Sequence, residues 1–411
     1  MTQSEAAGDA SYRGGEESRR TAAAAAPTSE DAPAMSSAPT SSATAGPAST
    51  GPEHVRPEPV DPDASGLDPV GPDTTGPDTT GPEPIDPELP ITEAEVREIA
   101  AEAEGVIAEI STIVEGKREV AQIALLVLLA GGHLLIEDIP GVGKTMLAKS
   151  LAAALGAERH RIQFTPDLLP GDVTGASIFS QSTSEFEFRP GAVFTQILLA
   201  DEINRASPKT QSALLEAMEE RQVSVDGTTY ELEEPFMVVA TANPVEMEGT
   251  YRLPEAQRDR FLAQTSMGYP VPSAESRMLA AQAGPVPRGD RDVLDAVRTR
   301  TTPERIAEHV RRVRRIHASP QILDYVVRLA DATRSHPQVS LGASPRAAVH
   351  LVRAAKAHAA LVGRTYVDPE DVRAVIMPVW RHRMHLTPQA LSRGGSAGEL
   401  VDQVLKGTSL T

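Results

Sequence analysis

A short loop at residues 140–145 carries the residue types that hold a polyphosphate. It reads Pro140-Gly141-Val142-Gly143-Lys144-Thr145 and lies between an apolar run and a segment with helical spacing. Such a loop turns successive backbone N–H groups toward one point, and the positive end of the following helix adds to the attraction. Lys144 would reach the β and γ phosphates of a nucleotide, and the Thr145 hydroxyl would join a Mg²⁺ shell. The loop departs from the pattern G-x-x-x-x-G-K-[ST] at its first glycine, where Asp138 stands.

Two acids follow a second apolar run, Ile197 to Ala200. Asp201 and Glu202 would therefore lie at the carboxyl end of a strand, where ligands bind in open α/β sheets. We expect Asp201 to hold Mg²⁺ through water and Glu202 to polarise the water that attacks the γ phosphorus. An Asp-Glu pair after a strand is common, but a position 57 residues after Lys144, behind another predicted strand, favours this role.

Three further residues are candidates for acting at the γ phosphate. Asn243 follows the apolar run Phe236–Ala240 and would orient the attacking water, although an Asx turn before a proline is also plausible there. Arg260 and Arg346 offer the fixed fork of donors that suits phosphoryl oxygens, although each alone could be a surface charge. The predicted nucleotide-binding set consists of Asp201 with Pro140, Gly141, Val142, Gly143, Lys144, Thr145 and Met146.

Apolar runs alternate with helical segments through the middle of the chain. The runs that predict strands are His133–Ile136, Arg161–Phe164, Gln196–Ala200 and Phe236–Ala240. The helices expected among them begin near Thr92, at Lys117 and at Thr145. This alternation predicts an α/β fold with a parallel sheet covered by helices on both faces. After about Gly268 only helical segments are recognisable, which predicts a separate all-α domain. They are Arg305–Ile316, Gln321–Ser335, Ala347–Val362 and Asp368–Val379.

The first 90 residues differ in composition from the rest of the chain. The 411 residues carry a formal charge of −18, and residues 1–90 contribute −12 of it, together with 15 of the 34 prolines and one aromatic, Tyr12. So few large apolar side chains cannot offset the entropy of ordering, which predicts a disordered, acidic arm. We therefore expect an arm at 1–90, an α/β nucleotide-binding core at 91–268 and a helical domain at 269–411.

Several classes of protein are excluded or disfavoured. The absence of cysteine excludes disulfide frameworks, thiolate metal sites and a cysteine nucleophile. The net negative charge argues against a protein that mainly coats nucleic acid, and the basic run Arg311–Arg315 lacks interleaved aromatics, so a solvated helix or a face for an acidic partner fits it better. His382 and His385 fit surface or packing roles better than a metal pair.

Neither a membrane span nor an export signal is recognisable. The apolar stretch Ile123–Ile136 is too short to cross a bilayer. The alanine run after Arg19-Arg20 is too short and too weakly apolar for a signal sequence, so we expect a cytoplasmic protein.

From about Thr92 to Leu405, the chain resembles MoxR-type AAA+ ATPases. The matching blocks are Gly141–Thr145, Arg161–Pro170, Asp172–Gly175, Asp201–Ala206, Lys209–Gln211, Leu214–Glu220, Ala240–Pro244, Leu253–Gln257, Asp259–Phe261 and Gly342–Ala347. So many blocks in the same order make the resemblance specific. It implies an AAA+ core followed by a helical lid, ATP and Mg²⁺ as cofactors, and a homo-oligomeric ring, a hexamer in this family.

The same resemblance implies roles for individual segments. Arg260 would be an arginine finger acting on the ATP of a neighbouring subunit, and Arg346 a sensor arginine reaching the nucleotide of its own subunit. Residues 175–193 would form an inserted β-hairpin near the ring pore, and residues 114–116 would lie against adenine.

Two functions are compatible with these residues. In the first, an ATP-driven ring remodels or matures a partner protein complex, together with a von Willebrand factor A domain protein, as the resemblance implies. In the second, the chain is a nucleotide-gated scaffold with negligible turnover. A scaffold needs neither a water-activating acid nor a finger, so Glu202 and Arg260 favour the first.

Overall fold

A computed structural model of the chain describes residues 89–243, 251, 253–283 and 293–410. All of them belong to the second of two compact units, which spans residues 79–411. The acidic arm expected at residues 1–90 thus lies outside the described residues, apart from its last two.

The core is built on a five-stranded parallel sheet with the strand order β2-β5-β8-β1-β9. Its strands are β1 Leu134–Glu137, β2 Arg159–Gln163, β5 Ile197–Asp201, β8 Met237–Ala242 and β9 Ala263–Thr265. Four of them confirm the predicted apolar runs to within two residues at either end. In β1, Leu134 and Ile136 pack into one layer of the core and Leu135 into the other. Burial on both faces is why β1, β5 and β8 read as continuous apolar runs, whereas most of the edge strand β2 is exposed.

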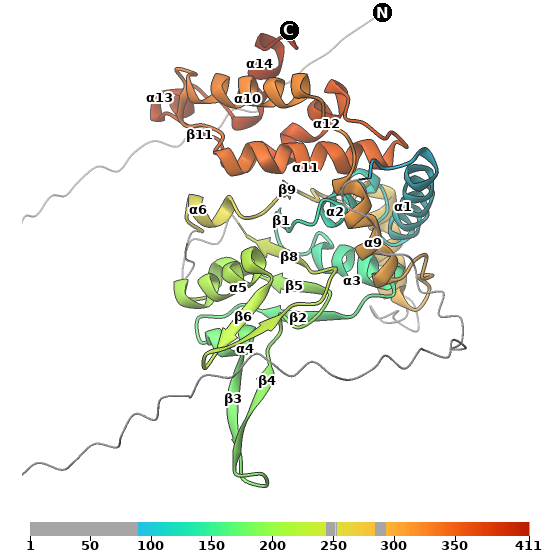
Figure 1. The fold of residues 1–411 in the computed structure, drawn as a ribbon, viewed down its shortest axis with the longest axis vertical. Coiled ribbons are helices and arrows are strands. Elements are labelled where there is room, and N and C mark those ends of the chain that lie inside the picture. Colours follow the sequence, from blue (N-terminus) through green and yellow to red (C-terminus); the bar gives the residue numbers. More distant parts are fainter. Residues whose placement is uncertain (1–88, 244–250, 252, 284–292, 411) are drawn as a thin grey trace, which may run out of the picture. The chain divides into compact units, whose positions relative to one another are not determined.

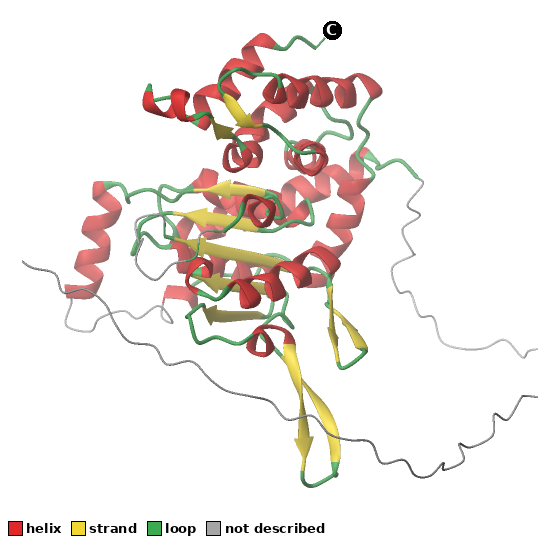
Figure 2. Cartoon of the chain, turned by 90° about the vertical axis from the view of Figure 1, so that its left-hand side faces the viewer, coloured by secondary structure: helices red, strands yellow, loops and turns green. Residues whose placement is uncertain are grey.

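Helices cover both faces of the sheet, as predicted, and the arrowheads of its strands point the same way in Figure 2. One face carries α1 Glu93–Ile113, α2 Arg118–Leu129 and α3 Lys144–Leu155. The other carries α4 Pro170–Thr174, α5 Pro208–Glu220 and the hairpin of β6 Gln222–Val225 and β7 Thr228–Glu231. α1 begins at the expected capping box, in which Thr92 and Glu95 each accept a backbone N–H of the other.

A long hairpin, β3 Gly175–Ser180 with β4 Glu185–Pro190, confirms the insertion predicted within residues 175–193. Figure 1 shows it extending beyond α4. Phe188 near its base stacks on Tyr230 of β7, with ring centroids 3.9 Å apart. Toward its tip, Phe179 and Phe186 are 50% and 74% exposed, so the hairpin is anchored at one end and presents apolar rings at the other.

The C-terminal part of the chain is a helical lid. The short helix α6 Glu255–Arg258 precedes β9 in the core, and α7 Pro272–Ala283 follows β9 on the way to the lid. Its helices are α9 Pro303–Arg314, α10 Pro320–Arg334, α11 Pro345–Leu361, α12 Pro369–Trp380, α13 Pro388–Ser392 and α14 Ala397–Gly407. α11 packs on α1 and α2, and α12 packs on β9. One short antiparallel pair, β10 Val339–Leu341 and β11 His385–Leu386, was not predicted because two or three residues show no periodicity. None of the helices in the described ranges is both long and apolar enough to cross a membrane.

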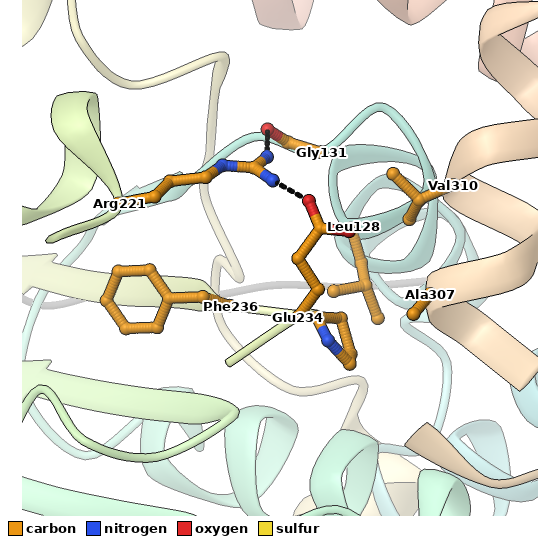
Figure 3. Close-up of a pocket in the computed structure, with 8 residues that line it drawn as sticks. Leu128, Gly131, Arg221, Glu234, Phe236, Ala307 and Val310 are labelled. Atoms are coloured by element: carbon orange, nitrogen blue, oxygen red, sulfur yellow. Dashed lines mark hydrogen bonds and ion pairs between the residues drawn. The ribbon is translucent and has the colours of Figure 1, made fainter. Parts of the chain in front are cut away.

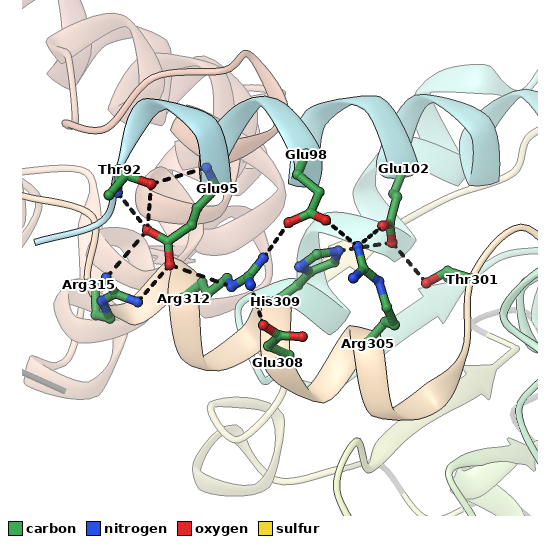
Figure 4. Close-up of polar contacts among 10 residues, drawn as sticks. All are labelled: Thr92, Glu95, Glu98, Glu102, Thr301, Arg305, Glu308, His309, Arg312 and Arg315. Carbon is green, nitrogen blue, oxygen red and sulfur yellow. Dashed lines mark hydrogen bonds and ion pairs between the residues drawn. The ribbon is translucent and has the colours of Figure 1, made fainter. Parts of the chain in front are cut away.

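A row of ion pairs joins α9 of the lid to α1 of the core (Figure 4). Arg305 contacts both Glu98 and Glu102, and the Arg315 guanidinium lies 3.0 Å from Glu95. Arg312 also contacts Glu98, at 2.6 Å. Two arginines of the run Arg311–Arg315 are thus largely buried, with Arg312 14% and Arg315 9% exposed. This part of the basic run is used within the chain and is not a solvated face.

Candidate nucleotide site

The loop between β1 and α3 contains two glycines in a left-handed backbone conformation. Gly141 and Gly143 have φ values of 83° and 95°, which side-chain-bearing residues rarely adopt. Lys144 begins α3, and its Nζ donates to the carbonyl of Asp138 at 2.6 Å and lies 3.5 Å from that of Ala242. Lys144 is therefore held between the ends of β1 and β8, at the carboxyl edge of the sheet.

The two predicted magnesium ligands are close together. Thr145 Oγ1 donates to Asp201 Oδ2 at 3.4 Å. The Asp201 side chain is 9% exposed and also accepts from Thr241 Oγ1 at 2.7 Å and Arg161 Nε at 2.9 Å. A hydroxyl and a carboxylate supply the oxygen ligands that Mg²⁺ prefers, so the donor set fits the expected cation.

Glu202 has an unusual backbone conformation for a residue with a side chain, with φ 56° and ψ 49°. Its N–H donates to Thr241 Oγ1 at 2.9 Å, and its carboxylate accepts from Gln163 Nε2 at 2.7 Å. Arg205 lies 3.2 Å from the same carboxylate. A left-handed residue of this kind costs about 1–3 kcal/mol and is typical of functional sites. The strands on either side of β5 thus fix the position of Glu202.

Asn243 completes the group at this edge. It is buried, follows the last residue of β8, and its carbonyl accepts from Asn204 Nδ2 at 3.3 Å. The ends of three adjacent strands, β1, β5 and β8, therefore bring together five of the predicted residues. These are Lys144, Thr145, Asp201, Glu202 and Asn243.

A pocket with a volume of about 320 Å³ lies beside the loop. One wall contains Val114 and Glu115, two of the three residues expected against adenine. Other lining residues are Gly141, Val142, Gly143, Met146, Ala274 and Met278. Its mixture of apolar side chains and loop backbone suits a purine base next to its phosphates. The loop residue Pro140 is exposed and is not among the residues that line it.

The structure explains the aspartate that replaces the first glycine of the motif. Asp138 is buried, and its carboxylate accepts from the backbone N–H of Gly268 at 2.6 Å and from Ser266 Oγ at 2.8 Å. Burial opposes ionisation, but these hydrogen bonds outweigh it and lower the pKa of Asp138. Asp138 thus ties the start of the loop to the segment that follows β9.

Arg260 and Arg346 lie together, but away from the nucleotide loop. Arg260 Nε is 2.7 Å from one carboxylate oxygen of Glu219, and Arg346 contacts the other. Both line a cavity with Gly131 and His133, the residues that precede β1. Because the four residues of β1 span about 13 Å, these arginines and Lys144 occupy opposite edges of the sheet. This differs from the expectation that Arg346 reaches the nucleotide of its own subunit.

Asp259, next to Arg260, connects the amino edge of the sheet to the lid. One of its carboxylate oxygens accepts from Arg383 Nε at 2.7 Å, and the other accepts from Ser344 Oγ, the N-cap of α11, at 2.9 Å. The Arg383 side chain is only 3% exposed, and burial lowers its pKa to about 10 despite the charge of Asp259. The position of Arg260 is therefore coupled to the docking of the lid.

Two more arginines brace the turn that leads into β1. Arg353 of α11 donates to the carbonyls of Ala130 and Gly131, both at 2.7 Å. Arg221 donates to the Gly131 carbonyl at 3.0 Å and pairs with Glu234, as Figure 3 shows. The amino edge of the sheet is consequently rich in guanidinium groups, and each of them contacts a backbone carbonyl or a carboxylate.

Three buried histidines lie behind these arginines. The His133 ring contacts the Met218 carbonyl through Nε2 and accepts from the Val238 N–H through Nδ1. Burial lowers the pKa of His133 to about 4. Burial and the Arg383 charge lower that of His350 to about 2. His382 is buried too, 3.3 Å from the Phe261 carbonyl, and burial lowers its pKa well below the ordinary value, so it has a packing role.

Sequence reasoning missed several residues of this arrangement. Gln163 and Thr241 contact the acids from neighbouring strands, and their signal is slight, since both are polar residues near the ends of apolar runs. No local sequence pattern indicates a role for Glu219, Asp259 or Arg383. Their partners lie on distant parts of the chain.

Comparison with known proteins agrees with this geometry. Residues 133–263 match the model of the "ATPase family associated with various cellular activities (AAA)", and residues 331–404 match the AAA lid domain. The chain is 48% identical over 296 residues to the uncharacterized protein YeaC of Bacillus subtilis (strain 168), covering 72% of this chain and 91% of that protein.

It is also 42% identical over 316 residues to Chaperone MoxR1 of Mycobacterium tuberculosis, covering 75% and 82% of the two chains. Identity to Protein MoxR of Paracoccus denitrificans is 33% over 303 residues, or 68% and 88% of the two chains. The crystal structure of a candidate ATPase from Cytophaga hutchinsonii matches with a TM-score of 0.70 at 35% identity, covering 78% of this chain and 98% of that one.

Proposed function

The chain belongs to the MoxR family of AAA+ ATPases, and we propose that it hydrolyses ATP to ADP and phosphate with Mg²⁺ in a homo-oligomeric ring, a hexamer by family resemblance. The observation that carries the proposal is the contact of Thr145 Oγ1 with Asp201 Oδ2 at 3.4 Å. It joins a phosphate-binding loop to an acid pair at one edge of the sheet. Phosphoryl transfer requires the phosphates, the cation and the attacking water to be held close together, and this arrangement brings the residues for all three to one edge.

Each residue at the carboxyl edge has a part in this reaction. The loop backbone and the Lys144 ammonium bind the β and γ phosphates, while Thr145 and Asp201 would hold the Mg²⁺, which offsets phosphate charge. Glu202 accepts a proton from water as the water oxygen bonds to the γ phosphorus and the bond to the ADP oxygen breaks. Asn243 orients that water.

Both arginines of the amino edge would act on the ATP of a neighbouring subunit. Within one chain, Arg260 and Arg346 share Glu219 about one strand length from Lys144. In a closed ring, each subunit presents one edge to the next, so a guanidinium pair can meet a phosphate that its own chain does not hold. We therefore assign Arg346, like Arg260, to the neighbour's nucleotide.

The cycle would drive remodelling or maturation of a partner protein complex in the cytoplasm, with a von Willebrand factor A domain protein as a candidate partner. The exposed rings of Phe179 and Phe186 support a protein client, because paired apolar rings at the end of a hairpin suit contact with protein. We also propose that residues 91–268 form the nucleotide-binding core of this ATPase and that residues 269–411 form its lid.

A nucleotide-gated scaffold remains the second candidate because of one contact. The Glu202 carboxylate accepts a hydrogen bond from Gln163 at 2.7 Å. A ring in which this contact persisted would bind ATP without activating water.

Two substitutions test the proposal. Lys144→Ala should abolish binding of a fluorescent ATP analogue, since the loop then lacks the charge that compensates the phosphates. Glu202→Gln should keep binding and lose phosphate release, because an amide cannot accept the proton. Glu216→Gln, at an exposed position of α5, is the control for loss of one carboxylate. Phosphate release by Glu202→Gln at the parental rate would refute the assigned base, whereas a parental chain that binds ATP without turnover would favour the scaffold.

A further inference from the structure

Glu219 lies between two arginines that come from different parts of the chain. Arg260 belongs to the segment that leads into β9, and Arg346 lies in the first turn of α11. Glu219 lies near the end of α5. Its Oε2 is 2.7 Å from Arg260 Nε, and its Oε1 contacts Arg346 Nη2, so each oxygen serves one guanidinium.

These contacts use only a small part of either guanidinium. Arg260 is engaged through Nε, and that contact is close but not aligned as a hydrogen bond. Arg346 uses Nη2, with Nη1 3.9 Å from Asp259. Each group has five N–H donors, so both can still bind a phosphoryl oxygen. The three side chains are 30–38% exposed, at the wall of the cavity.

The charge at this cavity makes the carboxylate necessary. Two guanidinium groups side by side repel each other, and Arg221 and Arg353 add positive charge to the same cavity. Glu219 is the acid that contacts both Arg260 and Arg346 within the described ranges. Without its charge, the long side chains would be expected to move apart into solvent.

We propose that Glu219 is a positioning residue that holds Arg260 of the core and Arg346 of the lid as a pair, set for the γ phosphate of a neighbouring subunit. The inference rests on the proposed shared site. Because one carboxylate contacts both guanidinium groups, the arginine of the core and the arginine of the lid keep a fixed position relative to each other. The approaching phosphate then binds donors that Glu219 leaves unused.

The test is the steady-state ATPase activity of Glu219→Gln in the assembled ring. We expect kcat to fall about tenfold and KM for ATP to stay within about twofold, because ATP is held by the other subunit's loop. Glu219→Asp keeps the charge and should recover part of kcat. Glu220→Gln, which changes the next exposed residue of α5, should match the parental enzyme. Melting temperatures should stay close to the parental value in all three variants.

Different failures have different meanings when Arg260→Ala is measured in parallel. If Arg260→Ala hydrolyses ATP at the parental rate, the shared site is wrong, and the role of Glu219 falls with it. If Arg260→Ala is inactive while Glu219→Gln keeps the parental kcat, only the role of Glu219 is refuted. Equal losses in Glu219→Gln and Glu219→Asp, with a lower melting temperature in both, would also overturn the proposal in favour of a merely structural contact.

Discussion

The carboxyl edge of the sheet carries the phosphate loop and acids, whereas the amino edge carries arginines. Asp201 and Asn243 lie where strands end, and the Lys144 ammonium contacts carbonyls at two such ends. Arg260 lies before a strand begins, and Arg346 is brought to the same edge by the lid. Because the edges are about one strand length apart, one chain contains both groups of residues without joining them. Under the proposed reaction, a complete site therefore needs two copies of the chain.

The two edges also differ in how their side chains are restrained. At the carboxyl edge, Glu202 and Asp201 are held by neighbouring strands of one sheet. At the amino edge, Asp259 is held by Ser344 and Arg383 of the lid. Lid movements should therefore displace the arginines more than the nucleotide loop.

The largest predicted effect is on turnover. Arg260→Ala and Arg346→Ala should each lower kcat about 10³-fold, the size typical of an arginine that stabilises phosphoryl transfer, with ATP affinity within a few-fold of the parental value. Phosphate release and calorimetric titration of ATP measure the two quantities, and Arg97→Ala on the exposed face of α1 is the control.

The same titration decides which subunit's nucleotide Arg346 contacts. If Arg346→Ala weakens ATP binding more than about tenfold in a dilute, unassembled chain, Arg346 contacts the nucleotide of its own subunit. It would then belong functionally to the carboxyl edge.

The next effect is on stability. Asp259→Asn leaves the nearly buried Arg383 without its carboxylate, and breaking a buried pair in this way costs about 3–5 kcal/mol. Urea denaturation should detect the loss, with Asp402→Asn on the exposed face of α14 as the control. A change below about 1 kcal/mol would mean that the lid is not fastened to the core through Asp259.

Acid pH should weaken the amino edge through its buried histidines. His133 and His350 have pKa values of about 4 and about 2 in the folded chain, below the ordinary 6.5. The unfolded chain thus binds protons below pH 6.5 that the folded chain does not, so stability is full above pH 6.5 and falls as the pH drops toward 4.

The loss should reach about 1.4 kcal/mol per histidine at pH 5.5, measured as a fall in melting temperature from pH 7.5. His350→Gln should flatten this dependence, and His317→Gln, at an exposed position, should not. A melting temperature that is constant between pH 7.5 and 5.5 would contradict the assignment.

The smallest effect concerns the ion pairs between α1 and α9, which lie outside both edges. Burial disfavours ionised Glu102, but Arg305, His309 and Thr301 donate to it and lower its pKa. Glu102→Gln should cost about 1–2 kcal/mol of stability and leave kcat unchanged. Glu93→Gln, in a largely exposed pair with Arg97, should cost at most about 0.5 kcal/mol. If Glu102→Gln and Glu93→Gln lower the free energy of unfolding equally, or if Glu102→Gln lowers kcat, these ion pairs do not act on stability alone.

The sequence predicts those parts of the site in which the chemistry requires neighbouring residues. The loop at residues 140–145 and the pair Asp201-Glu202 are contiguous and flanked by apolar runs, so their place at one sheet edge follows from parallel topology. The amino edge could not be predicted in this way. Glu219 and Arg346 are 127 residues apart, and their contact depends on how the lid docks. The edge to which Arg346 belongs is therefore a property of tertiary packing and not of any local pattern.

The most direct test of the shared site is a mixing experiment with Glu202→Gln and Arg260→Ala chains. Each chain alone should be inactive, because every interface lacks either the base or the finger. In an equal mixture with verified subunit exchange, roughly a quarter of the interfaces would combine an intact Glu202 with a neighbour's intact Arg260. Phosphate release should recover to about that fraction of the parental rate. A mixture that stays as inactive as its components would contradict a site built from two copies of the chain.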